Sequence, residues 1–366
     1  MSQGSPDRNA VLEGETFTPQ GLVQWKFQSR LGLFASPAIV SGRVYVGTGD
    51  GRLVALDAES GETRWEFTAG DAVKTTPAVA GGIVFAGLQD GRVIALNAET
   101  GDLIWEFSTG NPILSSPVVY EGVLYIGSND WRLYTLDAAT GKERWSFRAD
   151  DVIRSDPAVH PPVVGFTDIE GKLYLLDLNT GKRRFDYKGV NGAEGGAAFH
   201  GDRLFFADLG GRVRSVDWSQ REFPFEKNLV WIRLQLRHFG FIESVGQQKG
   251  FDWFFLERDS GFTTTPTVAH DLVYATSRSG STLALDRDSG DLRWRFESPH
   301  PFEVSPSVWE GTLLAADAGG TLHAVDALTG REVWAYNIGS PLASAPIVSG
   351  GVLYLTTSEG TLLCLR

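Results

Sequence analysis

Short stretches in which hydrophobic and polar residues alternate recur along the chain with a period of 40 residues. One unit covers residues 38–67, AIVSGRVYVGTGDGRLVALDAESGETRWEF, and its turn signals at SG, DG and DAESG divide it into four strands. Four-stranded units at this period are typical of a β-propeller, whereas parallel solenoids have shorter repeats. The pattern therefore predicts an all-β fold made of four-stranded antiparallel blades.

Two series of marker residues count the blades. The first series is aromatic, is expected on the outer strands, and comprises Trp25, Trp65, Trp105, Trp145, Phe185, Phe254, Trp294 and Trp334. The second is expected at the start of the inner strands and comprises Pro37, Pro77, Pro117, Pro157, Ala197, Pro266, Pro306 and Pro346. Eight members in each series predict an eight-bladed β-propeller. An orphan outer strand at residues 22–27 precedes the first blade, and we expect this N-terminal strand to pair with the C-terminal blade and close the ring.

The turn residues fit hairpins. Asp50–Gly51 and Asp90–Gly91 are predicted to form type I′ turns, in which a positive φ favours glycine. The carboxylate of Asp57 is expected to accept hydrogen bonds from backbone N–H groups of the next turn, which Gly61 closes in a left-handed conformation.

This organisation divides the chain into an N-terminal tail at residues 1–20 and a propeller at residues 21–366, with an insertion in blade five at about residues 219–250. The 22 Phe, 11 Trp and 9 Tyr are too much apolar area for a disordered chain. A net charge of −12 disfavours nucleic-acid binding, because an acidic surface repels phosphates. No stretch has the roughly 18 apolar residues that span a bilayer.

The first ten residues, MSQGSPDRNA, are polar and lack the apolar core of a signal peptide. We therefore expect a soluble chain that is cytoplasmic if Met1 is the native start, and periplasmic or extracellular if a signal peptide was removed. The single cysteine, Cys364, excludes an internal disulfide, and its place in an alternating apolar strand predicts an inert, buried thiol.

The segment from Ala55 to Trp65 resembles the tryptophan-docking motif A-x-D-x-x-[ST]-G-x-x-x-W of the pyrroloquinoline-quinone (PQQ) propeller family, and residues 284–294 and 324–334 repeat the motif in full. The resemblance implies that the eight aromatic residues wedge between adjacent blades. In size and layout, the chain is most similar to the outer-membrane assembly-factor branch of that family, bare eight-bladed propellers that scaffold a partner. It lacks the adjacent cysteine pair and the long inter-blade insertions of the family's dehydrogenases.

Positions that vary within the fixed repeat are candidates for function. Three residues before each member of the proline series, the repeats have Phe34, Lys74, Leu114, Arg154, Glu194, Thr263, Glu303 and Ala343. The residue before each of these is apolar, so strand alternation predicts that the apolar set faces the core while the variable set lines the mouth of an axial funnel. The charged members form either a solvated rim of ion pairs or a site for a ligand or peptide.

Trp131 is a second break in the repeat, because its counterparts in the other seven units are all glycine. A tryptophan on the turn between the second and third strands is expected on the same face as the funnel mouth. It either anchors a partner, as exposed aromatic residues do at binding hot spots, or packs locally against the turn.

The insertion is the third break, and register places it between the third and outer strands of blade five, on the face opposite the funnel mouth. Its apolar residues fit a strand and a helix about equally, so periodicity does not decide its conformation. It either folds back over the propeller or presents a patch to another chain. We prefer it as the partner site, with these candidate contact residues: Phe223, Phe225, Trp231, Leu234, Leu236, Phe239 and Phe241.

The sequence gives little support for a metal site or a catalytic site. His160 and His200 hold the same position in adjacent blades, with His270 nearby and His238 in the insertion, but packed sheets about 10 Å apart place such side chains too far apart to share a metal. The run from Asp286 to Glu297 is superficially similar to a calcium loop but has its glycine at the wrong position. No motif assembles a nucleophile with its base.

The sequence therefore predicts a non-catalytic scaffold that binds another protein of a larger assembly through the insertion, the funnel face or both, without nucleic acid, membrane span, metal or cofactor. The alternative is a PQQ-binding sensor or a small PQQ-dependent dehydrogenase with calcium. In that alternative, Lys74 and Arg154 would pair with the carboxylates of the cofactor.

Overall fold

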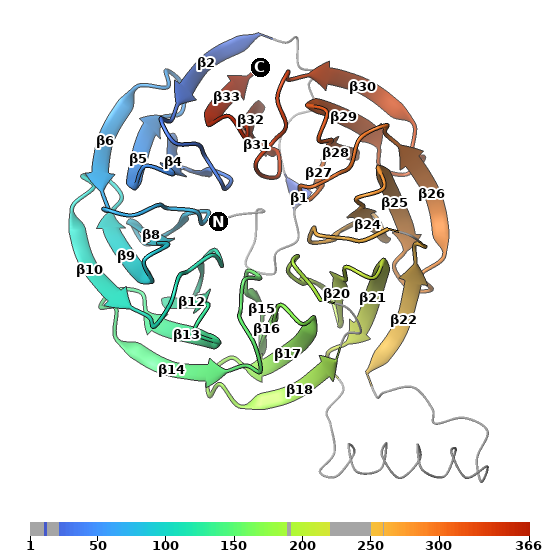
Figure 1. Ribbon diagram of the computed structural model, residues 1–366, viewed down its shortest axis with the longest axis horizontal. Coiled ribbons are helices and arrows are strands. Elements are labelled where there is room, and N and C mark those ends of the chain that lie inside the picture. Colours follow the sequence, from blue (N-terminus) through green and yellow to red (C-terminus); the bar gives the residue numbers. More distant parts are fainter. Residues whose placement is uncertain (1–10, 13–21, 189–191, 220–249, 259) are drawn as a thin grey trace.

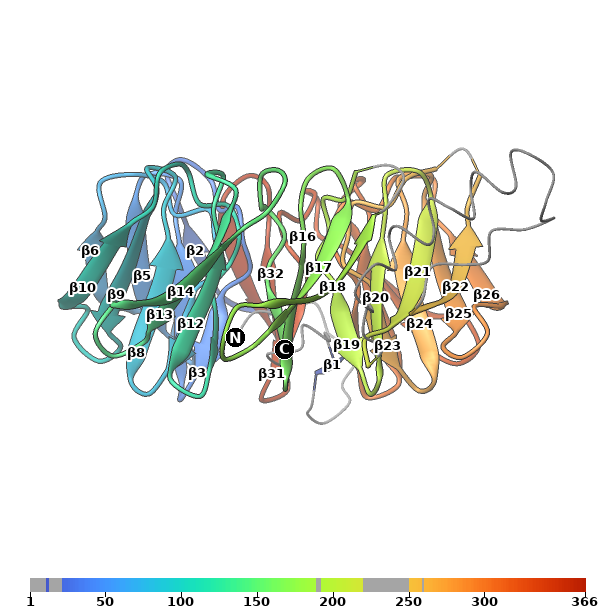
Figure 2. The same ribbon diagram turned by 90° about the horizontal axis from the view of Figure 1, so that it is seen from below.

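The computed structural model describes all residues except 1–10, 13–21, 189–191, 220–249 and 259. In this part of the chain, eight sheets stand around a central axis and form a closed ring (Figure 1). Seen from the side, the ring is a flat disc (Figure 2). Each blade has four antiparallel strands, which confirms the predicted eight-bladed propeller. The described residues contain no helix of the length and apolarity needed to cross a membrane.

Each class of strand has its own length and place. The inner strands are β3 (Ala38–Val40), β7 (Ala78–Ala80), β11 (Val118–Tyr120), β15 (Ala158–His160), β19 (Ala198–His200), β23 (Thr267–Ala269), β27 (Ser307–Trp309) and β31 (Ile347–Ser349). The second strands are β4 (Arg43–Gly47), β8 (Ile83–Gly87), β12 (Val123–Gly127), β16 (Val163–Thr167), β20 (Arg203–Ala207), β24 (Leu272–Thr276), β28 (Thr312–Ala316) and β32 (Val352–Thr356).

The third strands are β5 (Arg52–Asp57), β9 (Arg92–Asn97), β13 (Arg132–Asp137), β17 (Lys172–Asp177), β21 (Arg212–Asp217), β25 (Ser281–Asp286), β29 (Thr321–Asp326) and β33 (Thr361–Leu365). The outer strands are β6 (Thr63–Thr68), β10 (Leu103–Ser108), β14 (Glu143–Arg148), β18 (Arg183–Lys188), β22 (Phe251–Leu256), β26 (Leu292–Glu297), β30 (Glu332–Asn337) and β2 (Val23–Gln28). Blades one to seven begin at β3, β7, β11, β15, β19, β23 and β27.

Blade eight joins the two ends of the chain. Its order is β31, β32, β33 and then β2, so the N-terminal strand supplies the outer strand of the C-terminal blade. In the antiparallel β2–β33 pair, Trp25 lies opposite Cys364. The backbone N–H of Arg366 donates to the carbonyl of Leu22 at 3.3 Å. The predicted ring closure is therefore confirmed.

The hydrophobic core lies between the blades rather than within one layer. Second and third strands such as β4 and β5 are buried along nearly their whole length, because neighbouring blades cover both faces of each sheet. One cluster joins Trp25 and Cys364 of blade eight to Val44 of blade one, and corresponding clusters join each of the other neighbouring pairs among the described residues. Burial of one such large apolar side chain contributes about 1.5–3 kcal/mol.

The docking tryptophans pack on glycines of the next blade. The indole of Trp65 donates its Nε1–H to the carbonyl of Ala98 at 3.0 Å. A Cβ added to Gly101 would lie 2.7 Å from Cδ2 of Trp65, and Gly101 has a φ of +77°. This position therefore needs glycine for the close approach and for the left-handed backbone. Within the described chain, these indoles donate in the same way: Trp25, Trp105, Trp253 and Trp294.

The prediction for blade five was wrong by one residue. Trp253, not Phe254, is the docking residue of β22, and its Nε1–H donates to the carbonyl of Arg287 at 2.8 Å. Phe254 points outward and is 49% exposed. Twelve residues separate Trp294 from Pro306, but thirteen separate Trp253 from Pro266, so fixed spacing selects the wrong aromatic.

The type I′ turns lie in different hairpins from those predicted. Gly51 has a φ of +81°, but Asp50 is not among the described residues with positive φ, so Asp50–Gly51 does not form a type I′ turn; Asp90–Gly91 departs in the same way. The first hairpin of blade one has positive φ at both Ser41 and Gly42, as a type I′ turn requires. The predicted turn at Asp57 is confirmed, since its Oδ1 accepts from the N–H groups of Glu59 and Ser60.

Candidate functional site

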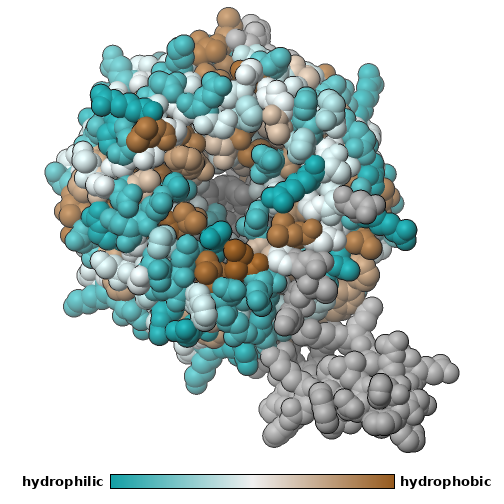
Figure 3. Space-filling view, in the orientation of Figure 1, coloured by the Kyte–Doolittle hydropathy of each residue, from teal (hydrophilic) through white to brown (hydrophobic). Residues whose placement is uncertain are grey.

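The funnel mouth contains a cavity of about 240 Å³ that is lined from every blade except five and six. Five of the predicted funnel residues line it: Phe34, Lys74, Leu114, Glu303 and Ala343. The ammonium group of Lys74 lies 5.0 Å from the centroid of the Phe34 ring, a cation–π arrangement. The apolar residues that precede the variable set are all buried, as strand alternation predicts. Figure 3 shows that the molecule is hollowed at the centre of the ring.

Three other predicted funnel residues do not line this cavity: Arg154, Glu194 and Thr263. Glu194 instead pairs with Arg278 at 3.4 Å, and both side chains are about half exposed. An exposed pair of this kind contributes at most about 1 kcal/mol. The funnel mouth therefore combines a lined cavity with a solvated ion pair.

A belt of hydroxyl groups, missed by the sequence reasoning, runs between blades next to the cavity. The backbone N–H of Thr76 donates to Oγ of Ser116 at 3.1 Å, and the N–H of Ser116 donates to the carboxylate of Asp156. Farther round the ring, the N–H of Thr265 donates to Oγ of Ser305 at 3.0 Å. The signal is present in the sequence, because the residue before the member of the proline series has a hydroxyl group in five of the eight repeats: Ser36, Thr76, Ser116, Thr265 and Ser305.

Trp131 adopts a conformation that its counterparts reach as glycines. Its φ is +75°, in the left-handed region that a bulky side chain rarely adopts. The side chain is 39% exposed, and the guanidinium of Arg148 lies 5.0 Å from the ring centroid. Backbone strain of this kind is often retained at functional positions.

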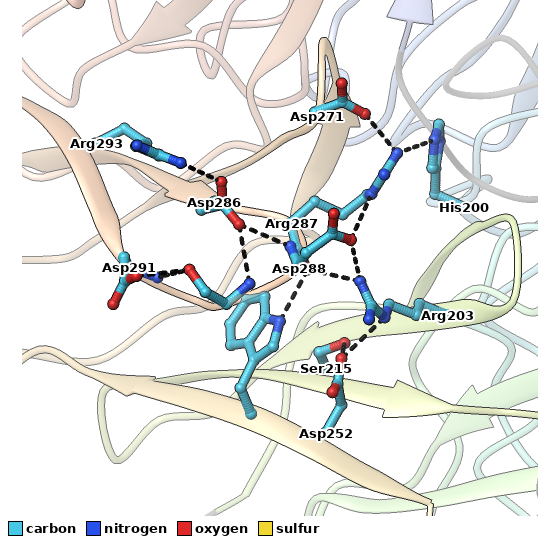
Figure 4. A network of polar contacts seen from close by, with 12 residues as sticks. His200, Arg203, Ser215, Asp252, Asp271, Asp286, Arg287, Asp288, Asp291 and Arg293 are labelled. Carbon is cyan, nitrogen blue, oxygen red and sulfur yellow. Dashed lines mark hydrogen bonds and ion pairs between the residues drawn. The ribbon is translucent and has the colours of Figure 1, made fainter.

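The insertion and its seven candidate contact residues, together with His238, lie outside the described residues, but its return into β22 is described. Figure 4 shows a network of charges at this place, between blades five and six. The guanidinium of Arg203 binds Asp252 at 2.9 Å and also contacts Asp288. Arg287 binds Asp271 at 2.6 Å and Asp288 at 3.2 Å. Trp253 holds the start of β22 to blade six directly, and Asp252 does so through Arg203, which also contacts Asp288 of blade six.

The outward face of β22 differs from those of the other outer strands. Phe254 is 49% exposed and Leu256 is 41% exposed. The ring of Phe254 lies 6.1 Å from that of Phe251, which stacks on Tyr187 of blade four at 6.2 Å. In register with Phe254 and Leu256, the other outer strands have Lys26 and Gln28, Glu66 and Thr68, Glu106 and Ser108, Ser146 and Arg148, Asp186 and Lys188, Arg295 and Glu297, and Ala335 and Asn337. Only blade five places two large apolar residues here.

The described histidines do not converge. His160 stacks on Phe199 with ring centroids 5.3 Å apart, whereas Nε2 of His200 lies 3.2 Å from Arg287. The residues that the structure describes hold no group of three or more metal-ligating side chains. Asp286, in the calcium-like run, accepts backbone N–H groups and pairs with Arg293 at 2.6 Å. The Arg293 hydrogen bond, together with the backbone donors, lowers the pKa of Asp286 to about 2.

Blade seven contains a buried polar chain that the sequence reasoning also missed. Ser298 donates its hydroxyl to Asp317 at 2.6 Å, and the His323 ring joins Asp317 at 3.1 Å to Glu332 at 2.8 Å. Burial alone would raise the pKa of Asp317, but hydrogen bonds from Ser298, the Thr321 backbone and His323 outweigh it and lower that pKa. Because Ser298 bonds the carboxylate and not the imidazole, the arrangement is not a serine nucleophile with its base.

The cavity lining fits the quinone cofactor of the family poorly. Lys74 lines the cavity as predicted, but Arg154, the second predicted partner for the cofactor's carboxylates, does not. Two carboxylates, Asp156 and Glu303, share the lining, and their negative charges oppose the binding of an anion there. The cation pair of the alternative hypothesis, Lys74 with Arg154, is therefore not assembled in this cavity.

A family model described as outer membrane protein assembly factor BamB matches residues 15–118, 89–222 and 278–365. Among solved structures, BamB from Moraxella catarrhalis is 16% identical, with a TM-score of 0.75, and the alignment covers 94% of this chain and 97% of that one.

A europium-containing methanol dehydrogenase is 15% identical, with a TM-score of 0.74, over 97% of this chain and 88% of that one. The computationally designed Ika8 protein is 14% identical, with a TM-score of 0.74, over 93% of this chain and 97% of that one. No curated protein sequence matches the chain. At these identities, the likenesses to solved structures establish the fold alone.

Proposed function

This chain belongs to the PQQ-like propeller family whose model is described as outer membrane protein assembly factor BamB, and from that premise we propose that it is a non-catalytic scaffold that binds another protein of a larger assembly. A bare ring of blades is a rigid platform, and function in such folds resides in the surfaces that depart from the repeat. The family supports the general role, while the choice of surface rests on this chain's own residues.

The observation that carries the proposal is the outward face of β22. Phe254 and Leu256 stand where the other blades have polar or small side chains. Outer strands have a free edge, and natural proteins protect such edges with charged residues to prevent pairing with other chains. On β22, two large apolar residues replace such charged residues, and this replacement marks a surface for a protein partner. The surface begins where the insertion ends, so the two form a continuous stretch of chain.

Trp131 supports a second contact on the funnel face. A partly exposed tryptophan beside an arginine is the type of residue that dominates binding energy at protein interfaces. Because we expect the insertion on the opposite face, the proposed scaffold has one partner element at the rim and another at the funnel mouth.

Site-specific photo-crosslinking in native cells tests the rim contact. A photoreactive phenylalanine analogue at position 254 should cross-link to one partner protein, because the side chain faces outward. The matched control is Ile104 on β10, which is 44% exposed on another outer strand. The double variant F254S/L256S should release the partner, whereas L103S/I104S should retain it. Equal cross-linking at 254 and 104, or at neither, would contradict the proposal.

A titration with PQQ, with and without calcium, tests the alternative of a cofactor-binding sensor or dehydrogenase. We expect no saturable quenching of tryptophan fluorescence, because Lys74 shares the cavity lining with the carboxylates of Asp156 and Glu303. Saturable binding at micromolar concentration, lost in K74A, would favour the alternative. Reduction of a dye by the loaded protein would extend it to an enzyme.

A further inference from the structure

The N-terminal segment contributes a strand that the repeat did not predict. β1 (Val11–Leu12) pairs in parallel with β27, with Val11 opposite Val308 and Leu12 opposite Trp309. It lies on the axial side of β27, because β28 occupies the other side, and it makes blade seven a five-stranded sheet. Figure 1 shows β1 near the centre of the ring, beside β27. The N-terminal tail therefore includes a short strand, β1, which binds the inner edge of blade seven.

An inner edge can accept an added strand, but only weakly. A strand edge presents unpaired N–H and C=O groups, and very short edge strands limit pairing with foreign chains. β27 has only 3 residues, so an added strand gains few hydrogen bonds. A segment tethered to the same molecule overcomes this weakness, because its effective concentration reaches the millimolar range. The geometry therefore favours a segment of this chain as the occupant.

The composition of the segment matches its place. Ala10, Val11 and Leu12 form an apolar triplet between the polar residues Asn9 and Glu13. Two of these residues, Val11 and Leu12, pair with the buried Val308 and Trp309 of β27, and the side chain of Val11 is 39% exposed.

The paired edge belongs to the blade beside the ring closure. Trp309 is part of the hydrophobic cluster that blade seven shares with blade eight, where it lies with Leu314 and Leu353. The segment that contains β1 continues to β2, which completes blade eight. The chain is thus held to blade seven at the axis and to blade eight at the rim.

We infer that the segment around Val11 and Leu12 is an intramolecular strand ligand, which occupies the axial edge of β27 and straps blade seven to the blade that closes the ring. The axial edge of β27 is accordingly a site for a short extended segment, and Val11 and Leu12 of this chain pair with it.

Competition with a synthetic peptide tests the site in the full-length chain. The variant V11D/L12D adds two charges at the strand and should free the edge. A labelled peptide of residues 6–16, PDRNAVLEGET, should bind this variant with a dissociation constant of about 0.1 mM, and bind the unchanged chain about tenfold more weakly, because the tethered segment competes at an effective concentration of about 1 mM. S2D/Q3D carries the same added charge away from β1 and should behave as the unchanged chain. Equal binding to all three proteins, or none to V11D/L12D, would overturn the site.

The labelling rate of the single cysteine tests independently whether the N-terminal segment holds the ring closed. Cys364 lies opposite Trp25 in the β2–β33 pair, so a thiol reagent reaches it when the ring opens. V11D/L12D should raise the labelling rate severalfold, while S2D/Q3D should leave it unchanged. Should V11D/L12D fail to fold, V11S/L12S replaces both apolar side chains without adding charge and is read in the same way. An unchanged labelling rate in a folded variant would show that the segment does not hold the ring.

Discussion

At the scale of single residues, the ring depends on glycines that allow an indole to approach the backbone. Gly101 beneath Trp65 and Gly141 beneath Trp105 are two instances of the same contact. A side chain at such a position must satisfy both a left-handed backbone and a distance shorter than ordinary contact.

Substitution of Gly101 by alanine should destabilise the protein by about 2–4 kcal/mol, because it adds overpacking against Trp65 to the strain of a positive φ. Gly82 is the matched control, with a φ of +76° and nothing within 4 Å of an added Cβ. Denaturant unfolding of G82A should show a loss of only about 1 kcal/mol. If the two variants lose the same stability, the close approach to the indole contributes nothing.

The aspartates of the docking turns should make stability depend on pH. The Arg64 hydrogen bond and the Ser60 backbone lower the pKa of Asp57, and the pKa of Asp286 falls to about 2. A pKa lowered in the folded state gives stability that is present above the unfolded value near 4 and is lost as pH falls toward the folded value. D57N/D286N should therefore lose about 1 kcal/mol at pH 7, but almost nothing relative to the wild type near pH 2.

Blade two allows the opposite substitution, in which a carboxylate and an arginine are introduced into the docking turn. Asn97 already accepts the N–H groups of Glu99 and Thr100, and Ile104 occupies the place of the arginine. N97D/I104R should add stability at pH 7 that disappears in acid. Urea unfolding at both pH values measures the two effects, and a difference that does not vary with pH would rule out the carboxylates as its source.

At the scale of one element, β22 keeps the register of the other outer strands, because Ser215 lies opposite Trp253 as Ala55 lies opposite Trp65. A strand alternates its side chains between two faces, so an assignment that is wrong by one residue exchanges the buried and exposed sets. The register buries Trp253 against blade six and exposes Phe254 at the rim, and the extra residue lies between β22 and Pro266.

Alanine substitution separates these two roles. W253A should cost about 3–5 kcal/mol, because it removes a buried indole and its hydrogen bond to Arg287. F254A should cost less than about 1 kcal/mol in the isolated protein, because the side chain is half exposed. Thermal or denaturant unfolding provides the measurement. If F254A lost more stability than W253A, Phe254 would be the docking residue, as the fixed spacing predicts.

At the scale of the whole molecule, the junction between β2 and β33 is where the ring can open without breaking the chain. Burial raises the pKa of the Cys364 thiol to about 11, so the folded protein should react slowly with thiol reagents at pH 8. Trp25 and Trp105 are both 9% exposed and make the same indole hydrogen bond, but only Trp25 lies at the junction. W25A should therefore accelerate labelling of Cys364 much more than W105A does. Equal acceleration would mean that the ring has no preferred point of opening.

The propeller could be predicted from the sequence because its information is periodic. Every blade repeats the same strand lengths, turn glycines and docking aromatics, so an error in one unit, such as Phe254 for Trp253, leaves the count unchanged. The site could be predicted only in part, because the cavity at Lys74 and Glu303 depends on which blades face one another across the axis. β1 was missed for a related reason, since two residues in a tail have no period.

The order of the strands in blade eight also means that its outer strand is synthesised long before the other three. Gln28 in β2 and its partner Thr361 in β33 are 333 residues apart in the chain. At a translation rate of 5–20 residues per second, the first of these strands waits on the order of 15–70 s for the second. During that time, β2 has an unpaired edge, and the other seven blades form before blade eight can close the ring. A nascent chain of this protein therefore needs either a chaperone or a provisional contact for its N-terminal strand until the ribosome has released the last residues.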